Sequence, residues 1–328
     1  MVTIERMWTE SFRPRKLDEV VGQKELIARL KQIVKRVDFP HMLFSGPPGI
    51  GKTTSAEAIV YEIYPPAERS ANVKRLNASD DRGINVVRED IKNFARVIPS
   101  GSATFKLIIL DEADQMTNDA QHALRRTMER YNEITRFILI CNYSSKIITP
   151  IQSRCAIFRF RSLDKEDIKS RLLQIAKKKQ LNVEDDALEA LYESSEGDLR
   201  QAINAMQASA SLTSDITTDV VFQVQGYVKP SEVRRAILDC VKSPPDFFGA
   251  RKNIQVLMES YGLSGQDLVK HLNKELSQIS NDQLPESIKF QALAMLSDVD
   301  YRLASGCNPQ VQFDAFLAKI IAATHEQR

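Results

Sequence analysis

Residues 46–53 carry the clearest chemical signal in this chain. They read Gly-Pro-Pro-Gly-Ile-Gly-Lys-Thr and match the pattern G-x-x-x-x-G-K-[ST], a glycine-rich loop that wraps phosphate groups. An apolar run at 42–44 precedes the loop and a helical pattern at 54–61 follows it, so backbone N–H groups and the helix dipole would face an anion. We expect Lys52 to reach the β- and γ-phosphates and Thr53 to bind Mg²⁺. A chance glycine turn is the weaker alternative, so the motif predicts binding of a nucleoside triphosphate.

An acidic pair follows a second apolar run. Residues 106–110 are continuously apolar from Leu107 onward, which is typical of a parallel strand buried on both faces. Asp111, at the carboxyl end of this run, is placed to hold Mg²⁺. Glu112 is placed to polarise a water molecule for attack on the γ-phosphate. The alternative is a strand followed by an acidic helix cap, which the presence of the phosphate loop disfavours.

Two more polar residues flank later strand-like runs. Asn142 follows the run 136–141, where its amide could reach a γ-phosphate or the attacking water. Its alternative role is that of a turn residue, because asparagine favours turns. Arg154 stands at the end of a short helical segment and just before the strand-like run 156–160, so it could project from the domain surface. Its alternative role is a surface ion pair, which would contribute little to stability.

Length and composition restrict the class of protein. A chain of 328 residues can hold two or three domains, and its net charge of +2 gives no global basic signature for nucleic acid. The opening residues lack a signal-peptide core, and no apolar run is long enough to span a bilayer. We expect an intracellular protein in a reducing compartment, with buried free thiols at four widely spaced cysteines: Cys141, Cys155, Cys240 and Cys307.

The second half of the sequence changes from strand-like to helical patterns. Asp164 and Asp198 are expected to cap helices at 165–179 and 199–210, and a third helix should run from 185 to 196 and stop at Gly197. Beyond residue 230 no strand-like run occurs. Turn residues there separate five expected helices: 231–241, 247–261, 265–279, 285–304 and 309–323.

The order of these motifs resembles one family. The phosphate loop, the Asp-Glu-Ala-Asp motif, Asn142, Ser-Arg-Cys at 153–155 and Gly-Asp-Leu-Arg at 197–200 resemble AAA+ ATPases of the clamp-loader clade, closest to replication factor C small subunits. Segments 8–14 and 17–23 resemble the adenine-pocket segment of that family, and 77–84 resembles the segment that leads into its DNA-facing helix. The specific motifs cover about the first 230 residues. Phe12 stands where relatives often have tyrosine.

The resemblance implies a fold and a set of site residues. The fold class is α/β: a RecA-like AAA+ P-loop domain with a parallel sheet (1–162), a three-helix lid (163–228) and an all-α collar domain for oligomerisation (229–328). Arg154 would be an arginine finger acting in trans on the ATP site of a neighbouring subunit, and Arg200 would sense the γ-phosphate in cis. Catalytic roles fall to Lys52, Glu112, Asn142, Arg154 and Arg200. The nucleotide contacts implied are Val2, Arg13, Val21, Gly46, Pro47, Gly49, Ile50, Gly51, Lys52, Thr53, Thr54, Asp111, Asn142 and Arg200.

Local basic residues could contact DNA despite the nearly neutral total charge. Arg82 and Arg88 fall near the start of an expected helix over 84–96, with Lys92 farther along it, and Lys146 is expected in the helix before Arg154. Phosphate contacts of this kind hold a duplex without reading its sequence. A solvated charged face is the alternative, and only the resemblance favours DNA.

These inferences together predict an ATP- and Mg²⁺-dependent DNA clamp-loader subunit. It would act with a large subunit and further small subunits in a pentameric ring, open a sliding clamp and place it on primer–template DNA, in the nucleus or the archaeal cytoplasm and without membrane association. One alternative is another DNA-associated AAA+ ATPase, such as an initiator or a branch-migration motor, although an initiator should carry a winged-helix domain. A second alternative is a structural ring subunit that binds nucleotide without hydrolysing it. A protein-unfolding AAA+ enzyme would need pore-loop aromatic residues, and none is convincing.

Overall fold

The computed structural model describes residues 7–35, 39–79, 87–225 and 230–326. The chain divides into two compact units, Met1–Thr217 and Thr218–Arg328. The boundaries expected after residues 162 and 228 stay predictions.

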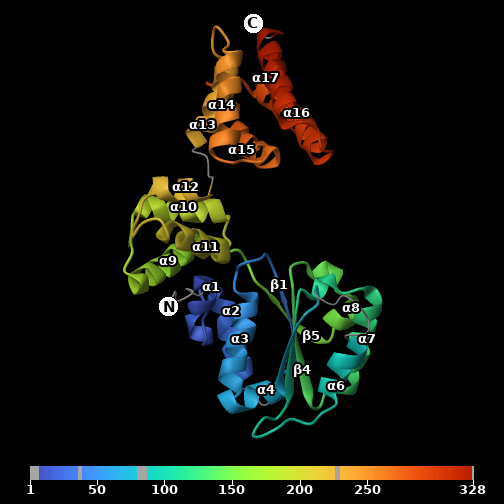
Figure 1. The fold of residues 1–328 in the computed structure, drawn as a ribbon. Helices are drawn as coiled ribbons and strands as arrows, with labels where there is room; N and C mark the ends of the chain where they lie inside the picture. The colour runs from blue at the N-terminus through green and yellow to red at the C-terminus, as the bar shows by residue number, and fades with distance from the viewer. Residues whose placement is uncertain (1–6, 36–38, 80–86, 226–229, 327–328) are drawn as a thin grey trace. The chain divides into compact units, whose positions relative to one another are not determined.

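A five-stranded parallel sheet forms the centre of the N-terminal unit (Figure 1). Its order is β2-β3-β4-β1-β5, so β1 lies between β4 and β5 and the chain crosses over repeatedly. Each crossover is long enough to hold a helix, as parallel pairing requires. The strands are β1 (His41–Ser45), β2 (Val73–Asn77), β3 (Lys106–Asp111), β4 (Thr135–Cys141) and β5 (Cys155–Arg159).

Helices cover both faces of this sheet, which explains its continuous apolar strands (Figure 1). On one face, Ile108 and Leu139 share a hydrophobic core with Leu124 and Met128 of the long helix α7. On the other face lie α2 and α3, and α3 buries Ile59 completely. The helices of this region are α1 (Trp8–Ser11), α2 (Lys24–Val34), α3 (Lys52–Ile63), α4 (Arg69–Asn72), α6 (Lys92–Ala95), α7 (Asn118–Arg130) and α8 (Thr149–Gln152).

The helix expected over 84–96 is only partly as predicted. Residues 84–86 lie outside the described residues, Val87–Ile91 form a π-helical turn, and α6 then ends at Ala95. Lys146 belongs to a separate 3₁₀ turn, Ser144–Lys146, and not to the helix before Arg154, which begins at Thr149. Proline at the second position of α8 cannot donate a backbone hydrogen bond, which explains why a new helix starts there.

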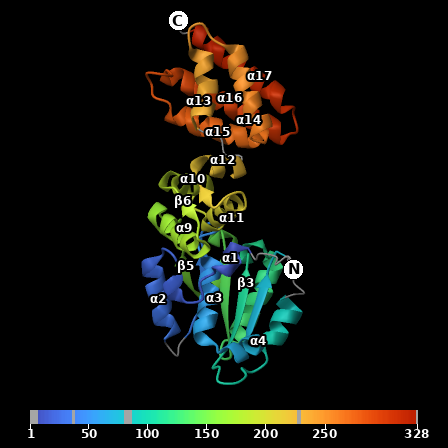
Figure 2. The ribbon, with the colours of Figure 1, turned by 60° about the vertical axis from the view of Figure 1, so that its left-hand side comes forward.

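The three lid helices form where the sequence predicted them: α9 (Lys165–Lys179), α10 (Asp185–Ser195) and α11 (Leu199–Ala210). The Asp198 carboxylate caps α11 by accepting the N–H groups of Arg200 and Gln201, whereas the Asp164 side chain makes no cap hydrogen bond. The structure adds a parallel pair of two-residue strands, β6 (Asn182–Val183) and β7 (Asp215–Ile216), beside these helices (Figure 2). Strands this short have no detectable sequence period.

Among the described residues of the C-terminal unit, helices joined by short loops occur and no strand does. The unit contains the five predicted helices and, before them, a helix that was not predicted, α12. Their bounds are α12 (Thr218–Gln225), α13 (Pro230–Val241), α14 (Phe247–Ser260), α15 (Gly265–Gln278), α16 (Glu286–Ala304) and α17 (Pro309–Glu326). One hydrophobic core joins α13 to α17, with Phe313 and Phe316 fully buried.

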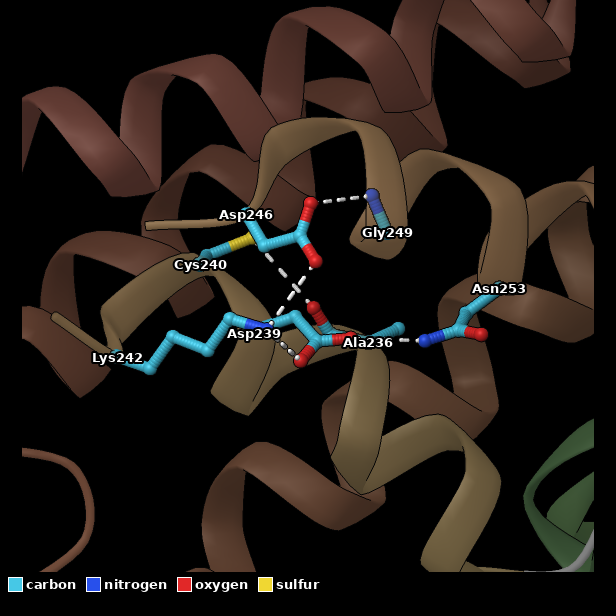
Figure 3. Close-up of polar contacts among 7 residues, drawn as sticks. All are labelled: Ala236, Asp239, Cys240, Lys242, Asp246, Gly249 and Asn253. Atoms are coloured by element: carbon cyan, nitrogen blue, oxygen red, sulfur yellow. Dashed lines mark hydrogen bonds and ion pairs between the residues drawn. The ribbon is translucent and has the colours of Figure 1, made fainter. Parts of the chain in front are cut away.

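Hydrogen bonds and ion pairs connect the end of α13 to the start of α14 (Figure 3). Asp239 accepts hydrogen bonds from Lys242 and Asn253, while Asp246 accepts the N–H of Gly249 and caps α14. Cys240 is buried beside them, and burial raises the pKa of its thiol to about 12. Cys141 is buried as expected and Cys155 is partly covered, but Cys307 is exposed, so the expectation of buried thiols was wrong there.

Across the described residues, no helix combines the length and apolar character needed to cross a bilayer.

Candidate nucleotide-binding site

The candidate site forms at the carboxyl ends of three neighbouring strands. Because β3, β4 and β1 are parallel and adjacent, the segments that follow them meet at one edge of the sheet. The phosphate loop follows β1, Glu112 follows β3, and Asn142 follows β4. The topology thereby gathers motifs that lie up to about a hundred residues apart in the sequence.

Two loop glycines are required by their surroundings. Gly46 has φ +147°, and a Cβ there would collide with the backbone oxygen of Phe160. Gly49 has φ +68°, and a Cβ there would collide with the Asp198 carboxylate at the start of α11. The loop therefore approaches both the end of the sheet and the lid more closely than a side chain would allow.

Lys52 points back into the loop that precedes it. Its ammonium group donates to the carbonyl oxygens of Gly46 and Pro47 and to Oδ1 of Asn142 at 2.9 Å. The side chain is buried, and burial lowers the pKa of this lysine, an effect that the charges of Asp111 and Asp114 partly oppose. A buried ammonium held by neutral oxygens is a strong attractor for a phosphate group.

The two residues predicted to hold a metal ion lie next to each other. The Thr53 hydroxyl donates to Oδ2 of Asp111 at 2.8 Å, while Oδ1 of Asp111 accepts the N–H of Glu112. Glu112 has a left-handed backbone with φ 52°, which is uncommon for a residue with a side chain. Its carboxylate is exposed beside the pocket that Lys52 and Thr53 line. Strained backbone of this kind is concentrated at functional sites.

A single pocket brings together most of the predicted residues. Its lining contains Arg13 and Val21 from the N-terminal segment, Lys52 and Thr53 from the loop, and Arg200 from the lid. The charge of Arg200 contributes to the lowered pKa of Lys52, so the two cations lie close enough to interact. The other predicted members are Gly49, Ile50, Gly51, Thr54, Asp111, Glu112 and Asn142. Gly46 and Pro47 contribute through Lys52, and Val2 lies outside the described residues.

Several residues of this pocket were not predicted from the sequence. Arg171 of α9 lines it and donates a hydrogen bond to the carbonyl oxygen of Phe12, which ties the N-terminal segment to the lid. The backbone N–H of Trp8 donates to Gln207 of α11 at 2.8 Å and strengthens the same connection. No local pattern marks these contacts, since the partners lie more than a hundred positions apart. Leu163, Leu199 and Ile203 were also not assigned to the site in advance. The rest of the lining falls in segments that the sequence did predict: Thr9, Phe12, Pro14 and Val20 in the adenine-pocket segments 8–14 and 17–23, and Pro48 in the phosphate loop.

Arg154 lies apart from the other predicted catalytic residues. It is not among the residues that line the pocket in the described part of the chain. Its side chain is about one-third exposed (37%) and forms an ion pair with Glu129 of α7, while Nη1 donates to the Pro150 carbonyl oxygen at 2.7 Å. The arginine is thus held on the surface of its own subunit.

Two of the four predicted DNA contacts can be located. Lys92 and Lys146 are exposed, and the Lys146 ammonium lies 5.2 Å from the ring centroid of the exposed Tyr143. Arg82 lies outside the described residues, and so does the side chain of Arg88. The proposed basic surface is therefore located only in part.

Three family models match the chain in succession. The ATPase family associated with various cellular activities (AAA) matches residues 42–163, an RFC1-like AAA+ ATPase lid domain matches 165–221, and the replication factor C C-terminal domain matches 228–319. Among solved structures, the Thermotoga maritima RuvB Holliday junction branch migration motor is similar in fold. It has a TM-score of 0.53 and 19% identity, covering 84% of this chain and 88% of that chain.

Curated relatives match over almost the entire length. The replication factor C small subunit of Thermofilum pendens is 47% identical over 96% of both chains. Those of Aeropyrum pernix and Archaeoglobus fulgidus are each 48% identical, over 96% and 95% of this chain and 95% and 96% of theirs. The chain therefore belongs to the replication factor C small-subunit family and is an AAA+ ATPase.

Proposed function

We propose that this chain is the ATP-hydrolysing small subunit of a clamp loader. It works with a large subunit and further small subunits in a pentameric ring, which opens a sliding clamp and places it on primer–template DNA. The relatives named replication factor C small subunit support this proposal. A nucleotide-binding subunit without turnover would have no need of Glu112 beside the pocket, and the presence of that carboxylate favours hydrolysis.

The proposed mechanism rests on where the catalytic side chains lie. Lys52, Glu112 and Arg200 line a single pocket, whereas Arg154 lies on the exposed surface near the end of α8. An arginine in that position can reach a γ-phosphate held by a neighbouring subunit. The proposed active site is therefore shared, with one subunit binding ATP and the next one completing the catalytic groups.

Each residue of the pocket has a separate task. Lys52 binds the β- and γ-phosphates in place of its present carbonyl partners, and Arg200 brings a second positive charge from the lid. Glu112 accepts a proton from the attacking water as a general base. Asn142, whose Oδ1 is held by Lys52, can offer its amide N–H groups to the γ-phosphate or to that water.

The residues present fit a magnesium ion. The Thr53 hydroxyl and the Asp111 carboxylate are oxygen ligands, and the 2.8 Å between their oxygens matches adjacent positions around one small cation. These two residues would hold Mg²⁺, which would offset negative charge on the phosphates. Arg82, Arg88, Lys92 and Lys146 would contact the DNA backbone on the inner side of the ring.

The remaining parts of the chain have assembly and regulatory tasks in this proposal. The lid, residues 163–228, closes over the nucleotide, and the collar, residues 229–328, joins the subunits. A reducing compartment, the nucleus or the archaeal cytoplasm, suits a chain whose described cysteines are all free.

A clamp-loading assay with the complete assembly tests the proposal. Lys52→Ala in every copy of this chain should abolish ATP-dependent transfer of a sliding clamp to primer–template DNA. Lys252→Ala, which removes an exposed lysine of α14, is the matched control and should load at the wild-type rate. Wild-type loading by the Lys52→Ala assembly would contradict the proposed function.

A further inference from the structure

Asp114, the last residue of the Asp-Glu-Ala-Asp motif, makes contacts that the proposed mechanism does not use. It is only 8% exposed, and its Oδ2 accepts the N–H groups of Asn142 at 3.3 Å and Tyr143 at 3.2 Å. Both amides lie immediately beyond Cys141, the last residue of β4. A carboxylate on the turn after β3 thereby holds the turn after the neighbouring strand.

These bonds matter because Asn142 is also held at its other end. Oδ1 of Asn142 accepts a hydrogen bond from the Lys52 ammonium at 2.9 Å. An ammonium group has donors only, so the side-chain oxygen must face Lys52, and the amide nitrogen of Asn142 remains a donor for the pocket. The backbone of Asn142 is set by Asp114 and its amide orientation is set by Lys52.

Asp114 does not line the candidate nucleotide pocket. Among the described residues that line the nucleotide pocket, Asn142 and Lys52 are present and Asp114 is absent. The buried carboxylate nevertheless interacts with the site electrostatically, since its charge favours the protonated form of Lys52. Burying a carboxylate is costly unless it accepts hydrogen bonds, and the two peptide N–H groups supply them.

We infer that Asp114 is a positioning residue for ATP hydrolysis, which acts by holding the peptide groups of Asn142 and Tyr143 so that the Asn142 amide faces the reacting phosphate. This inference rests on the proposed ATPase function of the same site. Nucleotide binding depends mainly on the loop and Lys52, which Asp114 does not touch by any hydrogen bond. Asp114 should therefore affect the rate of hydrolysis more than the affinity for ATP.

A double-mutant cycle in the assembled complex tests the inference. The variants are Asp114→Ala, Asn142→Ala and the two combined, and kcat, KM and the dissociation constant of a fluorescent ATP analogue are measured for each. Asp114→Ala should lower kcat by about tenfold or more, because small displacements of a positioning group cost that much, with nucleotide affinity within about threefold. In the Asn142→Ala background the same substitution should have almost no further effect.

Two further variants separate positioning from folding. Asp114→Asn keeps the side-chain volume and one acceptor oxygen, so it should retain more activity than Asp114→Ala. If the alanine variant does not fold, Asp114→Asn replaces it in the double-mutant cycle. Asp119→Ala removes an exposed carboxylate of α7 nearby and should keep wild-type kcat. If Asp114 had a purely structural role, Asp114→Ala would lower the melting temperature, and its reduction in kcat would add to the reduction caused by Asn142→Ala.

Two outcomes would overturn this inference while leaving the proposed function in place. One is that the reductions in kcat caused by Asp114→Ala and Asn142→Ala multiply in the double mutant. The other is that Asp114→Ala has the same kcat as a wild-type assembly that hydrolyses ATP. If the wild-type assembly had no ATP turnover that Lys52→Ala removes, the proposed function would fail first and this inference would fail with it.

Discussion

The two units of the molecule differ in the partners of a buried charged side chain. In the C-terminal unit, Glu275 is 2% exposed, and its Oε2 accepts bonds from Arg234 Nε at 3.1 Å and Nη2 at 2.8 Å. In the N-terminal unit, Lys52 is 7% exposed and is bound by two carbonyl oxygens and the Asn142 amide. No carboxylate of the described residues lies within ion-pair distance of Lys52. A charge in an ion pair serves as a structural contact, whereas a charge held by neutral oxygens, with the carboxylates of Asp111 and Asp114 beyond ion-pair distance, can bind an anion.

Other charged side chains of the C-terminal unit also form ion pairs, and these are more exposed than Glu275. Arg251 pairs with Asp314 at 3.0 Å and joins α14 to α17, and Lys242 lies between Asp239 and Asp246. These pairs connect helices around an apolar core. All the described residues that line the nucleotide pocket, by contrast, belong to the N-terminal unit.

The largest effect should come from Glu112, the proposed general base. Glu112→Gln keeps the size of the side chain but removes the base, so the hydrolysis rate should fall by about a hundredfold or more while ATP binding persists. Single-turnover hydrolysis and nucleotide affinity in the assembled complex check this prediction. Glu133→Gln, at an exposed position before β4, is the control. Equal turnover by wild type and Glu112→Gln would remove the catalytic assignment.

The comparison of buried charges predicts opposite effects on stability. Arg234→Ala leaves the Glu275 carboxylate buried without its cation and should lower the free energy of unfolding by about 3 kcal/mol. Lys52→Ala removes a buried charge that forms no ion pair among the described residues and whose burial outweighs its attraction to Asp111 and Asp114, so it should leave stability unchanged or raise it slightly. Urea denaturation of both variants measures the difference. Greater destabilisation by Lys52→Ala than by Arg234→Ala would show that the two charges have been assigned the wrong roles.

A smaller effect should come from His41 at the start of β1. Burial, assisted by the charge of Arg136, lowers the pKa of His41 to about 4 from its usual value of 6.5. The neutral form is favoured in the fold, so its stability contribution is present above pH 6.5 and is lost as the pH falls toward 4. Between about pH 7 and about pH 5 the loss should be about 2 kcal/mol.

The His41→Gln variant tests whether His41 causes this dependence of stability on pH. Its free energy of unfolding should depend less on pH than that of the wild type over the same interval, because the titrating group is absent. If the wild type and His41→Gln showed the same pH dependence, the buried histidine would not be the cause.

The smallest effect concerns the proposed DNA surface. Lys146→Ala should weaken binding of the assembled complex to primer–template DNA for all sequences alike, and it should reduce the slope of affinity against salt by about one unit or less. Titrations of two unrelated DNA sequences at several salt concentrations measure both quantities. Lys319→Ala, an exposed lysine of α17, provides the control. An unchanged slope would make Lys146 part of a solvated surface.

The parts of the site predictable from the sequence are those whose residues adjoin one another. The phosphate loop and the Asp111–Glu112 pair combine a strand end, a turn and a helix within a few positions, so local patterns identify them. The contacts of Arg171 and Asp114 depend on which strands and helices become neighbours, which local patterns do not encode. The same reason explains why the pairing of β6 with β7 went unpredicted.

The central claim is that Arg154 of one subunit completes the ATP site of the next. Assemblies in which subunits carrying Glu112→Gln are mixed with subunits carrying Arg154→Ala test it most directly. Some mixed interfaces then combine an intact Glu112 with an intact Arg154 from the neighbour, so ATP hydrolysis should rise above that of either mutant assembly alone. Glu129→Gln should remain active, because among the described residues Glu129 pairs only with Arg125 and Arg154 of its own chain. If Arg154→Ala instead abolished ATP binding by the isolated chain, Arg154 would act in cis and the shared site would be wrong.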